Sequence, residues 1–415
     1  MNPSKRNQQL LFQKTKATLS TMDSLHKNLL LKKFKMAEAG LNDKASTGET
    51  QNEELDEVLE LPSLPGKSTK RITEQEIVLE KTVRSLPQWS DFFLHSMQLQ
   101  KNDHKFQIYF QLPDKIDDPA TKTYPILIFH HGAGSSGLTF AQLCTHLNQL
   151  YKGKVGYLVY DARGHGQTEY TGTDPSKQDF SLIEFIQDEY VILDDFYHNK
   201  VIPHFRNDQK LLTKIKLLLV GHSLGGSIAT FLFDHISKSD KSKELRKKIM
   251  GVVMLDIVEE AAIAALNTMD RFLAQTPHSF EELSDAIDWH VVRGMPHKRN
   301  SAEISIPPLF NEAIERVTNL KVFEKYWGSW FTGLSSKFVE IATSKLLILA
   351  GNENLDKELI VGQMQGKYQL VVFQQSGHFI QEDCPKETAI TLQDFIQRND
   401  NRSTVIKSNW GSVQK

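Results

Sequence analysis

The chain has 415 residues, 40% hydrophobic and 24% charged, and its 49 Lys and Arg against 51 Asp and Glu give a formal net charge of −2. Such composition is typical of globular proteins, and charges that nearly cancel give no whole-chain attraction for nucleic acid. No apolar run approaches the roughly 20 residues of a membrane-spanning helix, and two cysteines, Cys144 and Cys384, are too few for a disulfide framework. These counts argue against an integral membrane, secreted or fibrous protein. They favour a reducing compartment, the cytoplasm, with the nucleus as a second location.

The first 77 residues differ in composition from the rest of the chain. Residues 1–36 carry eight Lys or Arg and one acid, whereas residues 37–64 carry eight acids and one base. A segment with so few apolar side chains cannot offset the entropy lost on ordering, so we expect residues 1–77 to form a disordered or weakly helical charged tail. A second tail is expected over residues 401–415. The basic start is also compatible with a mitochondrial targeting peptide, the minor alternative to a cytoplasmic location.

Between residues 78 and 400 the sequence alternates between short apolar runs and segments of helical periodicity. Six runs predict buried strands, at residues 125–129, 156–160, 215–220, 251–255, 345–350 and 369–373. Helical periodicity is clear over residues 182–196, 224–236 and 386–398. Near-continuous apolar strands separated by helices are typical of a mostly parallel sheet that is covered on both faces. The sequence therefore predicts one α/β domain over residues 78–400.

A helical segment from about residue 269 to 340 interrupts this alternation between two predicted strands. It is rich in Trp, Phe and His, and we expect it to form a cap or lid. Aromatic side chains are enriched where proteins contact partners, so Trp289, Trp327, Trp330 and Phe331 are candidates for such contacts. Packing of the lid onto the sheet is the alternative for the same side chains.

The sequence Gly221-His222-Ser223-Leu224-Gly225 is a G-x-S-x-G motif. It lies between a predicted strand and a predicted helix, which is the context of a nucleophile elbow. Such a turn holds its serine in a strained backbone conformation and presents the hydroxyl at the carboxyl edge of the sheet. We therefore interpret Ser223 as a nucleophile and His222 as a packing residue.

A serine hydroxyl is a weak nucleophile until a base removes its proton. His378 follows the last predicted strand, where a loop can return it to the elbow, and we assign it as the base. Position alone leaves the acid open: Glu353 and Asp356 follow the penultimate strand, and Asp256 follows the strand before it. Asp256 is flanked by apolar residues, and a buried carboxylate there needs a partner such as an imidazole.

An ester hydrolase also needs N–H donors for the oxyanion of its tetrahedral intermediate. We assign the N–H groups of Leu224, directly after the nucleophile, and of Ala133, in a loop after an earlier strand. Residues 132–137 of that loop are also a literal G-x-G-x-x-G, with Asp161 at the end of the next predicted strand. This is close to a dinucleotide-binding fingerprint, so an oxidoreductase is the alternative from this loop. That alternative leaves the elbow and His378 unexplained.

Six segments together resemble the fungal branch of the protein phosphatase methylesterase family: HHGAGSSGL, DARGHG, GHSLGGSIA, MLDIVEEAA, AGNENLDKELIVGQMQGKYQ and SGHFIQEDCP. The resemblance runs from about residue 86 to about residue 399. It implies an α/β-hydrolase fold and removal of the methyl ester from the C-terminal leucine of type 2A phosphatase catalytic subunits. It also implies that Ser223 is the nucleophile, His378 the base and Asp256 the acid, which selects among the carboxylates that position left open.

The resemblance further implies a protein substrate, the phosphatase catalytic subunit. Ester hydrolysis through a serine and a histidine requires no cofactor or metal, and we expect none. Gln363, Met364 and Gln365, before the final predicted strand, are our candidates for contacts with the phosphatase tail. Two other functions are compatible with the same motifs: a regulator that sequesters inactive phosphatase, and a general small-ester hydrolase.

Overall fold

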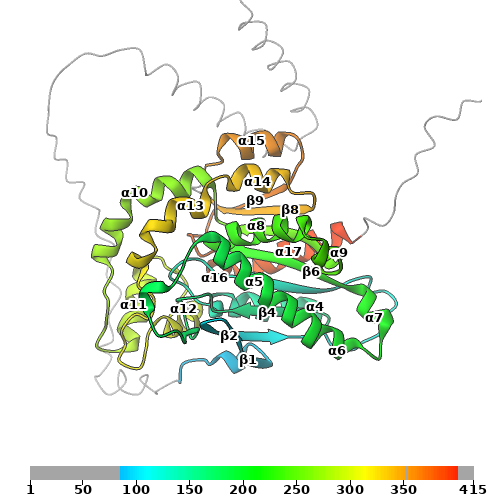
Figure 1. The fold of residues 1–415 in the computed structure, drawn as a ribbon, viewed down its shortest axis with the longest axis horizontal. Coiled ribbons are helices and arrows are strands. Elements are labelled where there is room, and N and C mark those ends of the chain that lie inside the picture. The colour runs from blue at the N-terminus through cyan, green and yellow to red at the C-terminus, as the bar shows by residue number, and fades with distance from the viewer. Residues whose placement is uncertain (1–84, 352–353, 401–415) are drawn as a thin grey trace, which may run out of the picture. The chain divides into compact units, whose positions relative to one another are not determined.

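The computed structural model describes residues 85–351 and 354–400. The predicted tails, residues 1–77 and 401–415, lie outside these residues. Within them a central sheet is flanked by helices on both faces (Figure 1). None of the helices described is long and apolar enough to cross a membrane. The predicted α/β architecture is therefore confirmed.

One mixed sheet has the strand order β1-β2-β4-β3-β6-β7-β8-β9, and β5 pairs with β2 outside this path. The strands are β1 (His95–Lys101), β2 (His104–Gln111), β3 (Tyr124–His130), β4 (Gly156–Tyr160), β5 (Glu169–Tyr170), β6 (Ile215–His222), β7 (Ile249–Leu255), β8 (Ser344–Ala350) and β9 (Gln369–Phe373). β2 runs antiparallel to β1, β4 and β5, and the other neighbours are parallel. All six predicted strands are present. β1 and β2 escape prediction because polar and apolar residues are mixed in HSMQLQK and HKFQIYFQ, so neither is a continuous apolar run.

Alternate side chains of each strand build two hydrophobic cores, one on each face of the sheet. The helices outside the insertion between β7 and β8 are α4 (Ala141–Tyr151), α5 (Leu182–Phe196), α6 (Ile202–Phe205), α7 (Gln209–Lys214), α8 (Leu224–Lys238), α9 (Lys243–Lys248), α15 (Lys357–Met364), α16 (Ile380–Asp383) and α17 (Pro385–Asn399). Leu127 and Phe129 of β3 share a core with α4 and α17. Ile126 and Ile128 of the same strand share the other core with α5 and α8. The three predicted helices are α5, α8 and α17.

A helical insertion, here called the cap segment, lies between β7 and β8. Its helices are α10 (Glu259–Gln275), α11 (Leu283–Val292), α12 (Arg299–Ser305), α13 (Trp327–Phe331) and α14 (Leu334–Glu340). Helices α10 to α13 lie together at one side of the sheet (Figure 1). Ala286, Ile287, Ala302 and Phe310 belong to a small hydrophobic core within this segment. Helical structure in the insertion thus begins at Glu259, before the position of about 269 that the sequence suggested for the cap.

Most large aromatic side chains of the cap segment pack inward. Trp330 is 1% exposed, and Trp327 and Phe331 are buried with it in the core shared with α5 and α8. The indole N–H of Trp330 donates a hydrogen bond to the carbonyl oxygen of Phe180 at 2.7 Å. For these three residues the assignment as partner contacts is wrong and the alternative, packing of the lid, holds. Trp289 differs, because it lines a cavity.

Helix α5 carries a carboxyl group into the protein interior. Glu189 is 1% exposed, and neither of its carboxyl oxygens has a hydrogen-bond partner among the described residues. Burial raises the pKa of Glu189 from 4.5 to about 8, so the folded protein keeps this group protonated at neutral pH. In the unfolded chain the carboxyl group of Glu189 ionises near its ordinary pKa of 4.5. Between pH 4.5 and about 8 this ionisation therefore favours the unfolded state.

We predict that Glu189 lowers the free energy of unfolding progressively as the pH rises from 4.5 to about 8, and that Glu189→Gln removes this contribution. Below pH 4.5 the carboxyl group of Glu189 is protonated in both the folded and the unfolded protein, so its titration does not change stability. As the pH rises from 4.5 to about 8, only the unfolded chain loses the proton, and the folded state becomes less stable relative to it. The amide has the same shape and does not titrate. Urea denaturation of both proteins across this pH range measures the difference. Identical pH dependence would contradict a protonated Glu189 in the folded state.

Candidate active site

Ser223 lies at the sharp turn between β6 and α8. Its backbone has φ 53° and ψ −120°, a conformation that non-glycine residues rarely adopt. Two glycines make this turn possible. A Cβ on Gly221 would lie 1.9 Å from the carbonyl oxygen of Gly225, and one on Gly225 would lie 2.1 Å from the carbonyl oxygen of His130. The structure therefore contains the predicted strand–turn–helix elbow, held by close backbone packing.

Asp256 directly follows β7 and holds the imidazole of His378. Its Oδ2 accepts a hydrogen bond from Nδ1 of His378 at 2.8 Å, and its Oδ1 accepts one from the N–H of Ala350 at 2.6 Å. The Asp256 side chain is 2% exposed and that of His378 is 48% exposed. Because Nδ1 donates to Asp256, Nε2 keeps its lone pair and is the atom that can accept a proton. No hydrogen bond joins this ring to the Ser223 hydroxyl within the described residues.

The other two candidates for the acid are Asp356 and Glu353. Asp356 is the N-cap residue of α15, where its side chain accepts hydrogen bonds from the N–H of Leu359 at 3.0 Å and from the hydroxyl of Ser335. It is occupied by helix capping, which is a common role for aspartate. Glu353 lies outside the described residues. The geometry therefore brings Asp256, and not Asp356, to His378.

Both predicted oxyanion donors come from segments next to Ser223. Leu224 is the first residue of α8, so its N–H is one of the donors that a helix leaves without an intrahelical acceptor. Ala133 lies in the loop after β3, directly after Gly132. A Cβ added to Gly132 would lie 3.1 Å from the Cβ of Ser223. The loop of Ala133 thus packs directly against the elbow.

Two neutral histidines fix the shape of the Ala133 loop. His131 donates from Nδ1 to the carbonyl oxygen of Gly132 at 2.8 Å and accepts the N–H of Ala162 on Nε2 at 3.0 Å. His165 accepts the N–H of Gly134 on Nε2 at 2.9 Å. A ring nitrogen that accepts a backbone N–H carries no proton, so both rings are neutral in this arrangement. Burial agrees with this, because it lowers the pKa of His165 to about 4 and that of His131 well below its ordinary value. Sequence reasoning assigned these two histidines no role.

His222 also contributes more than the packing role that the sequence suggested. Its Nε2 donates a hydrogen bond to the backbone carbonyl oxygen of His378 at 2.8 Å. Its ring is buried, and burial, the largest cause, lowers the pKa of His222 well below its ordinary value. The elbow is therefore tied to the loop of His378 through a neutral histidine. The adjacency of His222 to Ser223 in sequence was the only signal for this contact.

Asp161 does not support the dinucleotide alternative. It is 0% exposed, and its two oxygens accept the N–H groups of Gly137 at 2.7 Å and Gln167 at 2.8 Å. A ribose hydroxyl therefore has no access to this carboxyl group. The G-x-G-x-x-G loop of residues 132–137 instead forms part of the wall beside Ser223, and the oxidoreductase interpretation is wrong.

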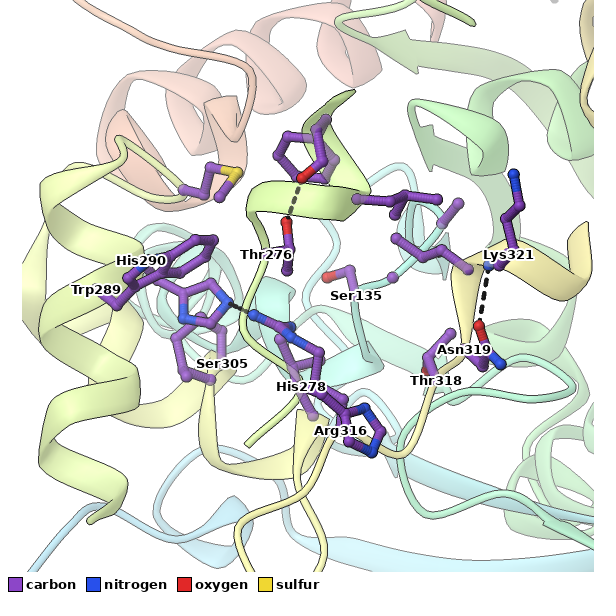
Figure 2. A pocket seen from close by; sticks show the side chains of 18 of the residues that line it. Ser135, Thr276, His278, Trp289, His290, Ser305, Arg316, Thr318, Asn319 and Lys321 are labelled. Carbon is purple, nitrogen blue, oxygen red and sulfur yellow. Dashed lines mark hydrogen bonds between the residues drawn. The ribbon is translucent and has the colours of Figure 1, made fainter. Parts of the chain in front are cut away.

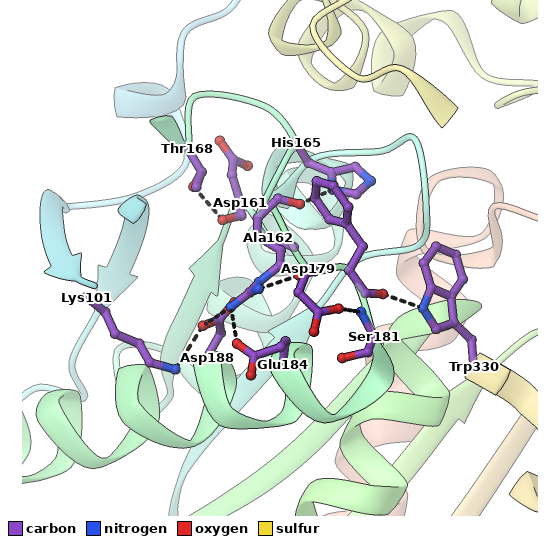
Figure 3. Close-up of polar contacts among 12 residues, drawn as sticks. Lys101, Asp161, Ala162, His165, Thr168, Asp179, Ser181, Glu184, Asp188 and Trp330 are labelled. Carbon is purple, nitrogen blue, oxygen red and sulfur yellow. Dashed lines mark hydrogen bonds and ion pairs between the residues drawn. The ribbon is translucent and has the colours of Figure 1, made fainter. Parts of the chain in front are cut away.

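An ion-pair cluster anchors the segment after β4 (Figure 3). Arg163 is 4% exposed, and its Nε and Nη2 donate to the two carboxylate oxygens of Asp188 at 2.5 and 2.8 Å. Lys101 donates to Asp188 at 2.9 Å, and Glu184 lies 3.1 Å from Arg163. Charges as buried as these need paired partners. The cluster thus holds the segment that includes His165, which in turn contacts the Ala133 loop.

A cavity of about 450 Å³ lies between the Ala133 loop and the cap segment. Figure 2 shows Ser135 on one wall and Trp289, His290 and Arg316 on another. The apolar lining includes Phe272, Leu273, Ile306, Leu309, Leu320 and Phe379, the last directly after His378. A concave, mostly apolar space of this size with a few polar groups is typical of ligand pockets.

Gln363, Met364 and Gln365 lie outside this cavity. Gln363 and Met364 form the end of helix α15, and Gln365 is its C-cap residue. Met364 is 53% exposed. Contact of these residues with a phosphatase stays a prediction. No group of three or more His, Cys, Asp or Glu in the described part of the chain is arranged to hold a metal ion.

Comparison with known structures agrees with this fold. Residues 127–391 match the alpha/beta hydrolase family. The crystal structure of E-2-(acetamidomethylene)succinate hydrolase has a TM-score of 0.52 and 16% sequence identity, covering 73% of this chain and 99% of that one. At this identity the likeness shows the fold alone.

Relatives in sequence identify the family within this fold. Protein phosphatase methylesterase 1 of Saccharomyces cerevisiae is 47% identical over 403 residues, which cover 94% of this chain and 98% of that protein. Protein phosphatase methylesterase 1 of Kluyveromyces lactis is 44% identical, covering 94% and 96%, and that of Candida albicans is 35% identical, covering 95% and 98%. With relatives this similar over nearly their whole length, the chain belongs to the protein phosphatase methylesterase 1 family of α/β-hydrolases.

Proposed function

We propose that this protein is a serine esterase that removes the methyl ester from the C-terminal leucine of type 2A protein phosphatase catalytic subunits. Its family membership supports the class of reaction, and the resemblance noted in the sequence supports the substrate. The observation that carries the chemistry is the pairing of His378 with the buried Asp256, next to a serine in a strained elbow. These are the parts that acyl transfer to serine requires.

In the first half of the reaction, the Oγ of Ser223 attacks the ester carbonyl carbon while Nε2 of His378 takes the hydroxyl proton. The N–H groups of Leu224 and Ala133 donate to the oxyanion of the tetrahedral intermediate. The bond to the methoxy oxygen then breaks, and His378 returns the proton to that oxygen, so methanol leaves. Ser223 remains as an ester of the leucine carboxyl group.

In the second half, His378 takes a proton from water as the water oxygen attacks this ester. Collapse of the second tetrahedral intermediate breaks the bond to Oγ, and His378 reprotonates Ser223. The side chain of Asp256 accepts the Nδ1 proton of His378 in a hydrogen bond and stabilises the imidazolium in both halves. The apolar lining of the cavity, which also includes Ala133, offers a place for the leucine side chain.

We further propose that α15 contacts the phosphatase outside the cavity. Three exposed apolar side chains lie on this helix: Ile360 and Val361 at 41% exposure, and Met364 at 53%. They are adjacent to Gln363 and Gln365, the other predicted contacts. Such a surface would add affinity for an intact protein that a short peptide cannot use. A reducing compartment, the cytoplasm, is part of the proposal, in keeping with Cys144 and Cys384 being free and buried.

Ser223→Ala is expected to lower kcat for a methyl ester by several orders of magnitude, because the variant lacks the nucleophile. The fold and binding of the phosphatase should be retained, since no described side chain hydrogen-bonds to this hydroxyl. A fluorophosphonate probe measures the reactive serine directly. Equal labelling of parent and variant would show that the nucleophile lies elsewhere.

Asp256→Asn is expected to lower kcat on the order of 10⁴-fold, by analogy with the triad aspartate, because the amide no longer fixes the tautomer of His378. The matched control is Asp356→Asn, which alters the cap of α15 and the hydrogen bond from Ser335 but not the contact with His378, and its effect on kcat should be mild. Steady-state kinetics with a peptide methyl ester compares the two. A large loss of kcat in Asp356→Asn with little change in Asp256→Asn would show that Asp356, not Asp256, is the acid.

The double variant Ile360→Gln with Met364→Gln is expected to lower kcat/KM for the intact phosphatase roughly tenfold, as for loss of an apolar interface anchor. Hydrolysis of a short peptide ester should stay the same, since neither residue lines the cavity. Ile390→Gln removes a similarly exposed isoleucine, 40% exposed, from α17 and serves as the control. Unchanged kinetics with the intact phosphatase would exclude α15 from the contact.

A further inference from the structure

Arg316 occupies a fixed position in the wall of the cavity. Its backbone N–H donates to the carbonyl oxygen of His278 at 2.8 Å, and an antiparallel bridge pairs it with Phe310. Its side chain is held as well: Nε donates to the carbonyl oxygen of Pro277 at 2.8 Å, and Nη2 donates to Nε2 of His290 at 3.0 Å. The guanidinium is therefore positioned before any ligand binds, which reduces the entropy lost on binding.

Aromatic rings and a neutral histidine surround this guanidinium. Its carbon atom lies 5.6 Å from the ring centre of Trp289 and 5.0 Å from that of Phe310. His290 accepts the bond from Arg316 on Nε2 and donates from Nδ1 to the carbonyl oxygen of Ala286 at 2.7 Å, so its ring carries one proton and no charge. Figure 2 shows His290 and Arg316 joined at the wall of the cavity.

No carboxylate neutralises Arg316 within residues 85–351 and 354–400. Burial lowers the pKa of Arg316 to about 10, with no acid opposing the shift, and the group remains charged at neutral pH. The other cation of the lining, Lys321, is paired with Asp270 at 2.7 Å and with Glu324 at 2.9 Å. A partly buried charge without a counter-ion is unfavourable unless a ligand supplies one.

The buried acid of the cavity does not fill this role. Glu382 is hydrogen-bonded to Ser305 at 2.6 Å and to Thr139, and burial raises its pKa to about 8, which keeps it protonated at neutral pH. Only two of the guanidinium N–H groups of Arg316 have acceptors among the described residues, and five are available in total. The remaining donors match the planar geometry of a carboxylate.

We propose that Arg316 is a specificity subsite for an Asp or Glu side chain of the substrate, located within the few residues that precede the methylated C-terminal residue. The inference rests on the proposed function. Ala133, the proposed oxyanion donor, and Arg316 both line the cavity, whereas Ser223 does not. A chain whose ester carbonyl oxygen is held by the N–H of Ala133 can therefore extend along the cavity toward Arg316. The C-terminal carboxyl group is esterified and carries no charge, and the carboxylate must therefore come from a side chain upstream.

Short peptides that end in leucine methyl ester test this without any variant. One series carries a single Asp at the first, second or third position before the leucine, and a matched series carries Asn there. At one position the Asp peptide should have the higher kcat/KM, by roughly ten- to a hundredfold, as expected for a charge-assisted hydrogen bond. Equal values for Asp and Asn at every position would overturn the proposal. Failure to hydrolyse either series would count against the proposed function instead.

Substitutions of Arg316 test whether this residue causes the preference for Asp peptides. Arg316→Gln should abolish the preference for Asp, and Arg316→Lys should retain part of it, because a charge remains but the planar fork is lost. Arg293→Gln is the matched control: Arg293 lies 5.5 Å from the same Trp289 ring but does not line the cavity, so the preference should persist. An undiminished preference in Arg316→Gln would refute the assignment. Thermal unfolding of each variant checks that the fold is intact.

Direct binding separates recognition from catalysis. Calorimetry with the Ser223→Ala protein compares the affinities of the Asp and Asn methyl esters. The Asp ester should bind more tightly than the Asn ester, and this difference should be absent when Arg316→Gln is added to Ser223→Ala. The free-acid form of the Asn peptide provides the second arm. If that peptide binds more tightly than its ester, and Arg316→Gln removes the difference, Arg316 recognises the product carboxylate and the side-chain subsite is refuted.

Discussion

The carboxylate of Asp256 joins three parts of the structure that are distant in sequence. It directly follows β7, accepts the N–H of Ala350 at the end of β8, and accepts the Nδ1 proton of His378 in the loop after β9. One oxygen is thus fixed by the sheet while the other orients the imidazole of His378, the proposed base. Because both oxygens have defined donors, the imidazole has one tautomer and its Nε2 is left to exchange protons.

Neutral, buried histidines form the support around this pair. His131 and His165 hold the Ala133 loop, and His222 holds the backbone of His378. Burial lowers the pKa of all three, so they keep the same hydrogen-bonding roles across the physiological pH range. In contrast, His378 is half exposed and accessible to substrate. The surrounding histidines thus maintain geometry, while His378 carries the proton transfer in the proposed mechanism.

The fold and the central residues follow from patterns that short stretches of sequence contain. Continuous apolar runs identify the parallel strands, and the glycines of the elbow identify Ser223. The choice of Asp256 over Asp356 needed the resemblance to a family, because both residues follow a strand and only three-dimensional contacts separate a helix cap from a histidine partner. The role of Arg316 has no local signature, since its lack of an acidic neighbour depends on packing between distant segments.

The central claim is that this site hydrolyses a methyl ester on a protein phosphatase. The most direct measurement incubates the purified protein with a type 2A phosphatase catalytic subunit that carries a labelled methyl group on its C-terminal leucine, and follows the release of labelled methanol. We expect complete release by the parent protein and none by Ser223→Ala. Retention of the label on the phosphatase, by a protein that still hydrolyses a small ester, would contradict it.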